Sequence, residues 1–495
     1  MKSVRSTKSL RSIRSAHTAR SGKIIDNNMQ SLDNMILIAC AKFNCPYTVT
    51  VKKETKQDEY YKSLKQTETK SRSKRINLLS QKKIQESSPD DLAYSDQTPS
   101  LTTTSSSHVN NVAITCMYDQ YNTLTELKIS NVKQVPHILL KIIGLLIPHY
   151  RNIVTININN CGINMYIIYE LGKMLHASTI TELCLDGSAL SSNDYSMLFE
   201  SKNLRNLSLC RCKIYDDACE IIASKLHHTA TADNLLLLNL SSNHITDEGA
   251  KYFGNALRTN RHLRYLNLAN NHISDYGAGY LLDMLIEFPL THDEILNTRR
   301  RRLDYYKLKQ TLYAKYLEEY CNNSIDQISV ISRKSSKRRK TSTTTLKSKS
   351  SGRKEKERPS SANAKEDYVK MKAEMMTAEI LGPFIDPFDS DFVKIVDGYI
   401  YSFGNMALAS LNLAYNNLSY LTIKKLYQVL LYQNVMRNPN QKGLIKVVLD
   451  GNNMPVNCTE ITAISDLMAR NTWQLSSRIS EVIRRKSRSL KVEKE

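Results

Sequence analysis

Two stretches of the chain are near copies of one another. Residues 238–257 read LNLSSNHITDEGAKYFGNAL. Residues 266–285, which begin 28 positions later, read LNLANNHISDYGAGYLLDML, and 11 of the 20 aligned positions are identical. Each copy follows the pattern LxxLxLxxNxL and then continues with small and apolar residues at helical spacing. One strand and one helix of this size cannot bury their apolar faces alone, so the copies must recur and stack.

The pattern recurs eight times along the chain. The first apolar positions of the copies are, in order, Leu124, Ile153, Ile180, Leu204, Leu235, Leu263, Leu408 and Leu444. Alternate leucines point to one side of a strand, and the residue at the Asn position, for example Asn243 or Cys212, can hydrogen-bond the backbone of the neighbouring turn. Successive copies among the first six start 24–31 residues apart, which leaves room for a helix in each. This pattern predicts an α/β solenoid.

A break separates the sixth copy from the seventh. They start 145 residues apart, a distance that five units of 29 residues would fill. However, residues 332–361 read SRKSSKRRKTSTTTLKSKSSGRKEKERPSS, which has too few apolar residues to bury a core. We therefore expect an insertion here, with no hidden repeats.

The segments on either side of the insertion are patterned. Leucines and tyrosines in residues 293–320 predict a helix that leaves the solenoid. This helix either packs back on the repeats or docks a partner. After the insertion, apolar residues alternate on both sides of Asp397 and Gly398, which predicts a two-residue β-hairpin that feeds into the seventh copy.

These features divide the chain into six parts. They are a mostly disordered basic region at 1–110, repeats one to six at 111–290, a protruding helix at 291–331, a basic low-complexity insertion at 332–391, the hairpin with repeats seven and eight at 392–475, and a basic tail at 476–495. The net charge of +21 is concentrated: residues 332–358 alone hold 12 Lys or Arg and 2 Asp or Glu. The pattern favours basic tails on a near-neutral scaffold.

The sequence offers little for chemistry. It lacks phosphate-binding glycine loops, CxxC pairs and the common nucleophile and zinc motifs, so we expect no enzyme activity, no cofactor and no metal. His244 and His272 occupy matching positions, and with Asp247 or Asp275 they could hold a metal, although solvated rim residues explain them more simply. No segment is long and apolar enough to enter a membrane or to serve as a signal peptide.

Residues between the strand leucines should face the concave side of the solenoid. They are mostly polar, small and uncharged, which suits a protein partner better than nucleic acid. The predicted protein-binding residues are Asn157, Asn159, Glu182, Asp186, Asn206, Ser208, Asn239, Tyr265, Asn267 and Asn412. Tyr265 ranks first because aromatic residues dominate binding hot spots.

The basic insertion is a second candidate site. Its polyanion-binding residues would be Arg333, Lys334, Lys337, Arg338, Arg339 and Lys340. The tract has no interleaved aromatic residues to stack on single-stranded bases, and the acidic tails of tubulin are one polyanion that it could bind. A solvated linker without a partner is the simpler alternative.

The repeat resembles the ribonuclease-inhibitor subtype of leucine-rich repeat over roughly residues 120–290 and 405–470. This resemblance implies a leucine-rich-repeat solenoid, shaped as a horseshoe of about eight repeats. The layout around the break is similar to the animal family called leucine-rich repeat-containing protein 71. The similarity rests on an Arg run at 299–302, a long Lys-rich insertion, and the short motifs at 382–384, 397–398 and 404–405.

The second resemblance implies a non-enzymatic protein-interaction scaffold in the ciliary or flagellar axoneme, with microtubule or axonemal proteins as partners. Two alternatives stay open. One is a nuclear adaptor whose basic insertion binds nucleic acid. The other is a GTPase-activating solenoid, which shares the repeat subtype but is selected by no residue in this sequence.

Overall fold

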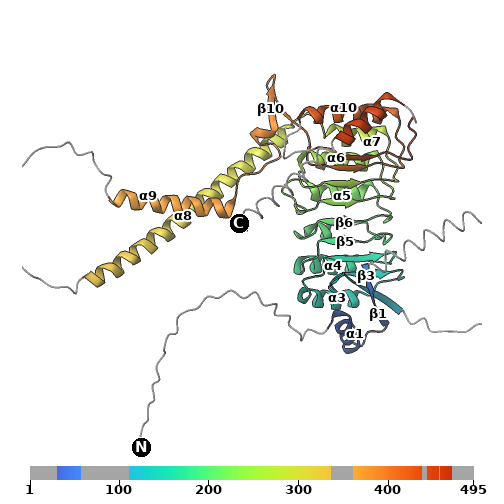
Figure 1. Cartoon of the computed structure of the whole chain (residues 1–495), viewed down its shortest axis with the longest axis horizontal. Helices are drawn as coiled ribbons and strands as arrows, with labels where there is room; N and C mark the ends of the chain where they lie inside the picture. The colour runs from blue at the N-terminus through green and yellow to red at the C-terminus, as the bar shows by residue number, and fades with distance from the viewer. Residues whose placement is uncertain (1–30, 57–110, 336–360, 437–442, 456–457, 471–495) are drawn as a thin grey trace, which may run out of the picture.

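The computed structural model describes residues 31–56, 111–335, 361–436, 443–455 and 458–470. Its main feature is one ten-stranded sheet with the order β1-β2-β3-β4-β5-β6-β7-β8-β12-β13 (Figure 1). The strands are β1 (Thr48–Thr55), β2 (Asn111–Tyr118), β3 (Leu124–Ser130), β4 (Thr155–Asn159), β5 (Glu182–Cys184), β6 (Asn206–Ser208), β7 (Leu237–Asn239), β8 (Tyr265–Asn267), β12 (Ser410–Asn412) and β13 (Lys446–Val448). All neighbouring pairs are parallel except β2 and β3.

Helical segments follow the strands from β3 onward and stack with them; we call these strands and helices the stack. The segments are α3 (His137–Leu146), η1 (Ile147–His149), α4 (Met165–Ala177), η2 (Ser196–Glu200), α5 (Asp216–Leu226), α6 (Asp247–Thr259), α7 (Asp275–Asp283) and α10 (Tyr420–Met436). This strand–helix alternation, with its parallel sheet, fits the predicted α/β class.

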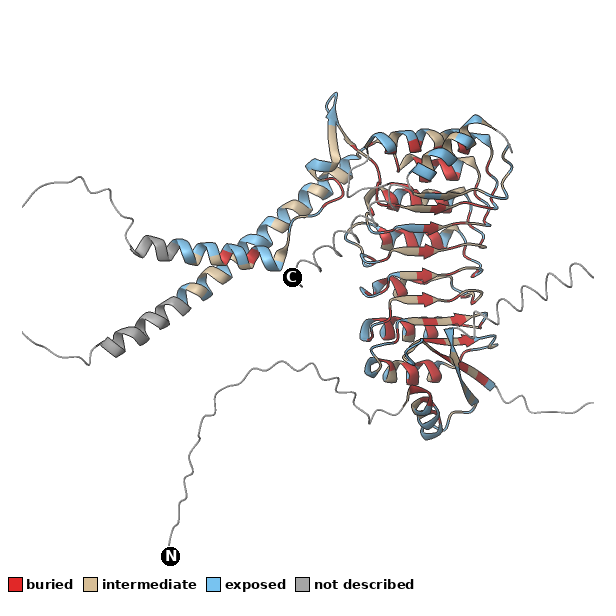
Figure 2. Cartoon of the chain, viewed as in Figure 1, coloured by how far each residue is buried: buried red, intermediate tan, exposed pale blue. Residues whose placement is uncertain are grey.

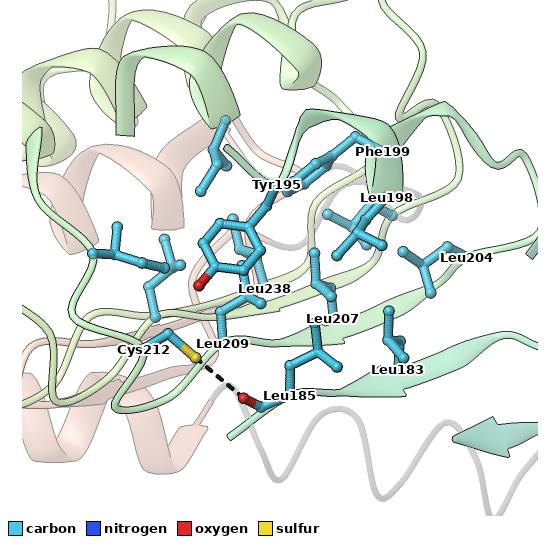
Figure 3. Packing of buried hydrophobic residues seen from close by; sticks show 14 of the residues in the cluster. Leu183, Leu185, Tyr195, Leu198, Phe199, Leu204, Leu207, Leu209, Cys212 and Leu238 are labelled. Carbon is cyan, nitrogen blue, oxygen red and sulfur yellow. Dashed lines mark hydrogen bonds between the residues drawn. The ribbon is translucent and has the colours of Figure 1, made fainter. Parts of the chain in front are cut away.

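The strand leucines form a continuous core between sheet and helices. Leu183, Leu207 and Leu238, the middle residues of three adjacent strands, are at most 2% exposed. Figure 3 shows them packed in layers against the aromatic side chains of Tyr195 and Phe199. Each repeat therefore shares its apolar surface with the repeats on both sides, which is the stacking that the repeated pattern requires.

The Asn position bonds each turn to the next, as predicted. The buried amide of Asn243 donates to the carbonyls of Leu209 and Leu240, and its oxygen accepts from the N–H groups of Cys212 and Ile214. Asn271, Asn416 and Asn452 repeat this arrangement in the following copies.

A cysteine at the same position bonds with its thiol. The Cys212 Sγ donates to the Leu185 carbonyl at 3.2 Å (Figure 3). Burial raises the pKa of Cys212 to about 12, so the thiol stays protonated and can donate. The prediction that the residue at this position bonds to the backbone of the neighbouring turn therefore holds for Cys212.

A second ladder, made of aspartates, was not predicted as such. The Asp247 carboxylate accepts from the Ser274 N–H at 2.7 Å, the Ser274 hydroxyl at 2.6 Å and the Gly277 N–H at 3.0 Å. Asp216 does the same for the start of α6. A Cβ at Gly277 would come within 2.4 Å of the Asp247 carboxylate, so the matching glycines keep room for this contact. Each aspartate thus caps the next helix, and its negative charge interacts favourably with the positive N-terminal end of that helix.

Asp275 extends this ladder across the break, to Ser419 and Thr422 at the start of α10. Burial acts to raise the pKa of Asp275, but hydrogen bonds from Ser419 and Thr422 outweigh it, and the net pKa is lowered. Because the folded-state pKa is depressed, the stabilisation is present above the unfolded value near 3.8 and is lost as pH falls through the folded value.

We expect Asp275→Ala to destabilise the chain by about 2 kcal/mol at pH 7, because it removes a charged cap. The difference from the wild type should shrink as the pH falls below 4. Urea unfolding at several pH values measures this. Asp217→Ala is the matched control, since Asp217 is exposed in the first turn of α5 and should cost only a few tenths of a kcal/mol. Equal losses in both variants would contradict the capping role.

The break does not interrupt the sheet. Strand β12 pairs directly with β8, with Leu411 opposite Leu266, although 145 residues separate them in sequence. The returning chain is fixed by Asn405, whose amide donates to the Leu257 and Asn260 carbonyls at 2.9 and 2.8 Å, and whose oxygen accepts from the Leu408 N–H. In the sheet, therefore, no repeat strand of the described residues lies between β8 and β12.

The predicted hairpin is confirmed. Strands β10 (Val393–Val396) and β11 (Tyr399–Ser402) pair antiparallel, and β9 (Phe288–Pro289) adds a third strand. Asp397 and Gly398 have φ angles of 51° and 82°, the left-handed conformation at both central positions that a tight hairpin favours. A short 3₁₀ turn, η3 (Ser390–Phe392), precedes the hairpin.

The basic insertion differs from its prediction at its C-terminal side. Residues 332–391 were expected to be low-complexity throughout, but α9 (Ser361–Leu381) packs against α8 (His292–Ser335). We call this helix pair the arm; it projects from the stack in Figure 1. Of the two alternatives for the protruding helix, packing back on the repeats is limited to its first turn, where Glu294 accepts from Arg258 of α6; farther along, α8 packs against α9. The composition of the basic tract does not reveal α9, because that tract ends before α9 begins at residue 361.

Part of the N-terminal region, for which mostly disordered chain is the prediction, is folded; the rest of residues 1–110 lies outside the described residues. Residues 31–56 form α1 (Leu32–Lys42) and β1, and β1 pairs with β2 over eight residues. Leu32 and Ile36 are fully buried against the first repeat. The apolar run at 35–40 is therefore part of an end cap. The polar sequence on both sides of this short run makes it hard to recognise as part of a folded segment.

Candidate protein-interaction face

The candidate face is built by alternation along short strands. In β5, β6 and β7 the middle leucine is buried and the residues on each side are half-buried. Because successive strand residues point to opposite faces, the flanking side chains lie on the side of the sheet away from the leucine core. We call this surface the sheet face.

The parallel register places the flanking residues in two rows. The first row runs Thr155, Glu182, Asn206, Leu237, Tyr265, Ser410 and Lys446, and the second runs Asn157, Cys184, Ser208, Asn239, Asn267, Asn412 and Val448. Eight of the ten predicted binding residues lie in these rows. The other two adjoin the second row: Cys184 donates its thiol to the Asn159 side chain, and Ser208 donates to Asp186. The structure thus brings all ten predicted residues together on one face.

The N-terminal half of this face is bonded to itself. Glu182 accepts from Thr155 at 3.0 Å and from Asn206 at 2.8 Å. Farther along, Asn239 donates to Ser208 at 2.9 Å, and Ser208 donates to Asp186 at 2.6 Å. These side chains are held in fixed positions before any partner arrives, so binding would cost little side-chain entropy.

The C-terminal half has more free capacity. Asn267 and Asn412 each accept one bond from a backbone N–H two residues ahead, at 3.1 Å. Their amide NH₂ groups have no partner within the described residues. Tyr265 lies on the same strand as Asn267, is 50% exposed and is flanked in register by Leu237 and Ser410. An exposed tyrosine on a rigid strand, beside free amide donors, is suited to contact a protein.

Sequence reasoning missed part of the face. Glu126 on β3 is buried, accepts from the Asn157 amide and pairs with Lys128 at 3.3 Å. The repeat that starts at Leu124 matches the pattern poorly, so the sequence does not clearly assign Glu126 and Lys128 to the sheet face. The spacing of Leu124 and Leu127 is the signal that could have placed them there. Lys446 of β13 is the cation at the opposite end. The face therefore carries both signs of charge.

The predicted polyanion site lies largely outside the described residues. Lys337, Arg338, Arg339 and Lys340 fall in the undescribed range 336–360. The backbone of Arg333 and Lys334 belongs to the last turn of α8. These residues stay a prediction.

The histidine pair has a structural explanation. His244 stacks on Tyr215 at 4.9 Å and on His272 at 5.9 Å between ring centroids. Asp247 and Asp275 are engaged with the N-termini of α7 and α10. In the part of the chain that the structure covers, no three His, Cys, Asp or Glu side chains converge as metal ligands. Rim stacking therefore accounts for these residues.

Comparison with protein families supports the repeat assignment. Residues 233–254 and 259–282 match a family model described as Leucine Rich repeat. A search of curated proteins finds no match. With the parallel stack, this match supports a leucine-rich repeat protein. Such repeats are typically non-enzymatic interaction modules, and no catalytic family is indicated. Among the described helices, none is long and apolar enough to cross a membrane.

Proposed function

We propose that this chain is a non-enzymatic scaffold that binds a protein partner on its sheet face, which forms the concave side of a horseshoe of about eight repeats. The observation that carries the proposal is the pair of pre-bonded polar rows with the exposed Tyr265 among them. The acidic Glu182 and Asp186 on this face disfavour nucleic acid as its partner.

We further propose a structural role in the ciliary or flagellar axoneme, with the basic insertion contacting acidic surfaces such as those of microtubules. Support comes from the similarity to leucine-rich repeat-containing protein 71 around the break. There the Arg run at 299–302 and the motif at 382–384 join α8 to the segment that follows α9, and the motif at 404–405 bonds the returning chain to the stack.

Localisation tests the cellular part. The tagged full chain, expressed in ciliated cells, should lie along the axoneme. A purely nuclear signal would contradict this role and favour the nuclear adaptor, in which deletion of residues 332–358 should abolish both nuclear entry and retention on heparin.

A substitution tests the face itself. We expect Tyr265→Arg to lower recovery of axonemal partners about 30-fold, the effect of losing a 2 kcal/mol hot spot. Quantitative pulldown with the full chain from axonemal extract measures this. Tyr276→Arg is the matched control, because Tyr276 is 82% exposed on α7, on the helix side of the stack. Equal recovery by both variants would show that the sheet face is not the binding surface.

A further inference from the structure

The arm has a groove that its two helices leave open. Tyr306, Lys309, Gln310 and Tyr313 of α8 and Glu374, Thr377 and Ala378 of α9 line a space of about 540 Å³. In Figure 2 most of the arm's described surface is exposed or intermediate, with buried positions confined to the contact between the helices. The arm therefore carries a hollow surface away from the stack.

Exposed and half-buried apolar side chains also recur at helical spacing on both helices of the arm. On α8, Leu303, Tyr306 and Tyr313 lie three and seven residues apart, and on α9, Met371 and Met375 lie four apart. Tyr306 is 58% exposed, and both methionines are 60% exposed. Stripes at this spacing form one face of a helix. Exposed methionines beside an aromatic residue are typical of helix-docking surfaces.

The two walls of the groove carry opposite charges. Lys309 stands on the α8 wall and Glu374 on the α9 wall. Neighbouring charges are engaged: Arg301 pairs with Asp386, and Lys307 with Asp304. Within the described residues neither Lys309 nor Glu374 has an ion-pair or hydrogen-bond partner. A charged pair of this kind is available for a docking molecule.

We propose that the occupant is the arm of a second copy of this chain, related by a two-fold axis that runs along the mouth of the groove, parallel to the helices. Rotation by 180° about that axis exchanges the walls, so Lys309 of each copy lies over Glu374 of the other. A two-fold interface is self-complementary in this way. A partner surface of a single charge would meet one like charge in the same groove, so the charge pattern favours a second copy.

The apolar positions follow the same symmetry. The helices are antiparallel, with Lys309 and Glu374 at one level, so Tyr306 lies near the level of Ala378, and Met371 near that of Tyr313. Because the axis runs along the arm, the rotation keeps each level, and it places Tyr313 of one copy over Met371 of the other. Sulfur–aromatic contact is favourable, and four helices can bury stripes that two leave exposed.

A charge swap tests the proposal with the full chain. The wild type should be a dimer by sedimentation equilibrium at about 100 µM. Lys309→Glu and Glu374→Lys should each weaken dimerisation at least about 10-fold, because each juxtaposes like charges. An equimolar mixture of the two variants should restore the dimer, since both intermolecular pairs are then opposite in sign. Lys307→Glu, outside the groove, is the matched control and should dimerise as the wild type does.

Each other result overturns the proposal. A monomeric wild type at this concentration, undiminished dimerisation in both variants, or failure of the mixture to associate would each do so. Circular dichroism of every variant checks that the fold is retained, which separates a lost interface from a lost fold.

A distance measurement checks the orientation. Cys321 on α8 is the one exposed cysteine of the ten, and it lies 12 residues beyond Lys309. Because the rotation keeps each level, the two α8 helices run parallel at diagonal positions of the four-helix arrangement, and spin labels at the two Cys321 positions should be less than about 20 Å apart. Cys321→Ser supplies the background. A separation of about 36 Å, twice the 12-residue rise, would indicate antiparallel α8 helices and would contradict the axis along the groove.

Discussion

Replacing Asn243 by alanine should destabilise the stack by about 3–5 kcal/mol, although the change removes only one amide. The side chain is 4% exposed and makes four strong contacts with the backbone of its own turn and the preceding one. In the variant the N–H groups of Cys212 and Ile214 and the carbonyl of Leu209 lose their partner, and each such buried group costs about 1–3 kcal/mol. The Leu240 carbonyl keeps its bond from Asn271.

Urea unfolding measures the change, and the melting temperature should fall by roughly 10 °C. Asn255→Ala is the matched control: Asn255 is exposed on α6, and alanine is the better helix former there, so its effect should be near zero. If Asn243→Ala costs less than about 1 kcal/mol, water or a shifted turn must replace the lost bonds, and the ladder would not be a main source of stability.

Asn243 also shows what the sequence can predict. A repeat is a local pattern that recurs, so the buried leucines, the Asn ladder and the Asp397–Gly398 turn follow from residues near each other in the chain. The rows of the sheet face were predictable for the same reason, because alternation in each strand fixes which side chains share a face.

Long-range pairings could not be predicted in this way. The pairing of α9 with α8, of β1 with β2, and of Asp386 with Arg301 joins segments about 60 to 90 residues apart, and no period marks them. The Asp275 contacts were equally hidden, because the capped residues lie beyond the break. Side-chain bonds across the sheet face, such as Ser208 with Asp186, depend on rotamers that a pattern of residue types does not specify.

The second large effect is expected from a substitution at the base of the arm, at Asp386. Asp386 has a fully buried carboxylate that accepts from Arg301 at 2.6 Å, from Thr298 at 3.3 Å and from the Phe388 N–H at 3.0 Å. Burial acts to raise the pKa of Asp386, but the hydrogen bond from Arg301 and the other donors outweigh it, and the net pKa is lowered. The carboxylate therefore stays charged at neutral pH and fixes the end of α9 beside α8.

Asp386→Ala should weaken the attachment of α9 by about 3–5 kcal/mol, because it leaves the partly buried Arg301 guanidinium without its counter-charge. Hydrogen exchange measures this locally: amides of the described part of α9 and of residues 382–392 should lose protection, while the strands β4 to β8 keep theirs. The stack is spared because Asn405 and the β8–β12 pairing fix the returning chain independently.

The pH dependence of the α9 attachment and a control at a neighbouring ion pair provide two further tests. In the wild type the attachment should be fully present above the unfolded pKa near 3.8 and be lost as pH falls through the lower folded value. Asp389→Ala is the control, since Asp389 pairs with Arg302 at 2.5 Å but both side chains are partly exposed, so its loss should cost at most about 1 kcal/mol. If the two variants release α9 equally, burial of Asp386 is not what secures the arm. If Asp386→Ala also exposes β8 and β12, the arm and the stack form one cooperative unit, and the insertion helps to join the repeats on either side of it.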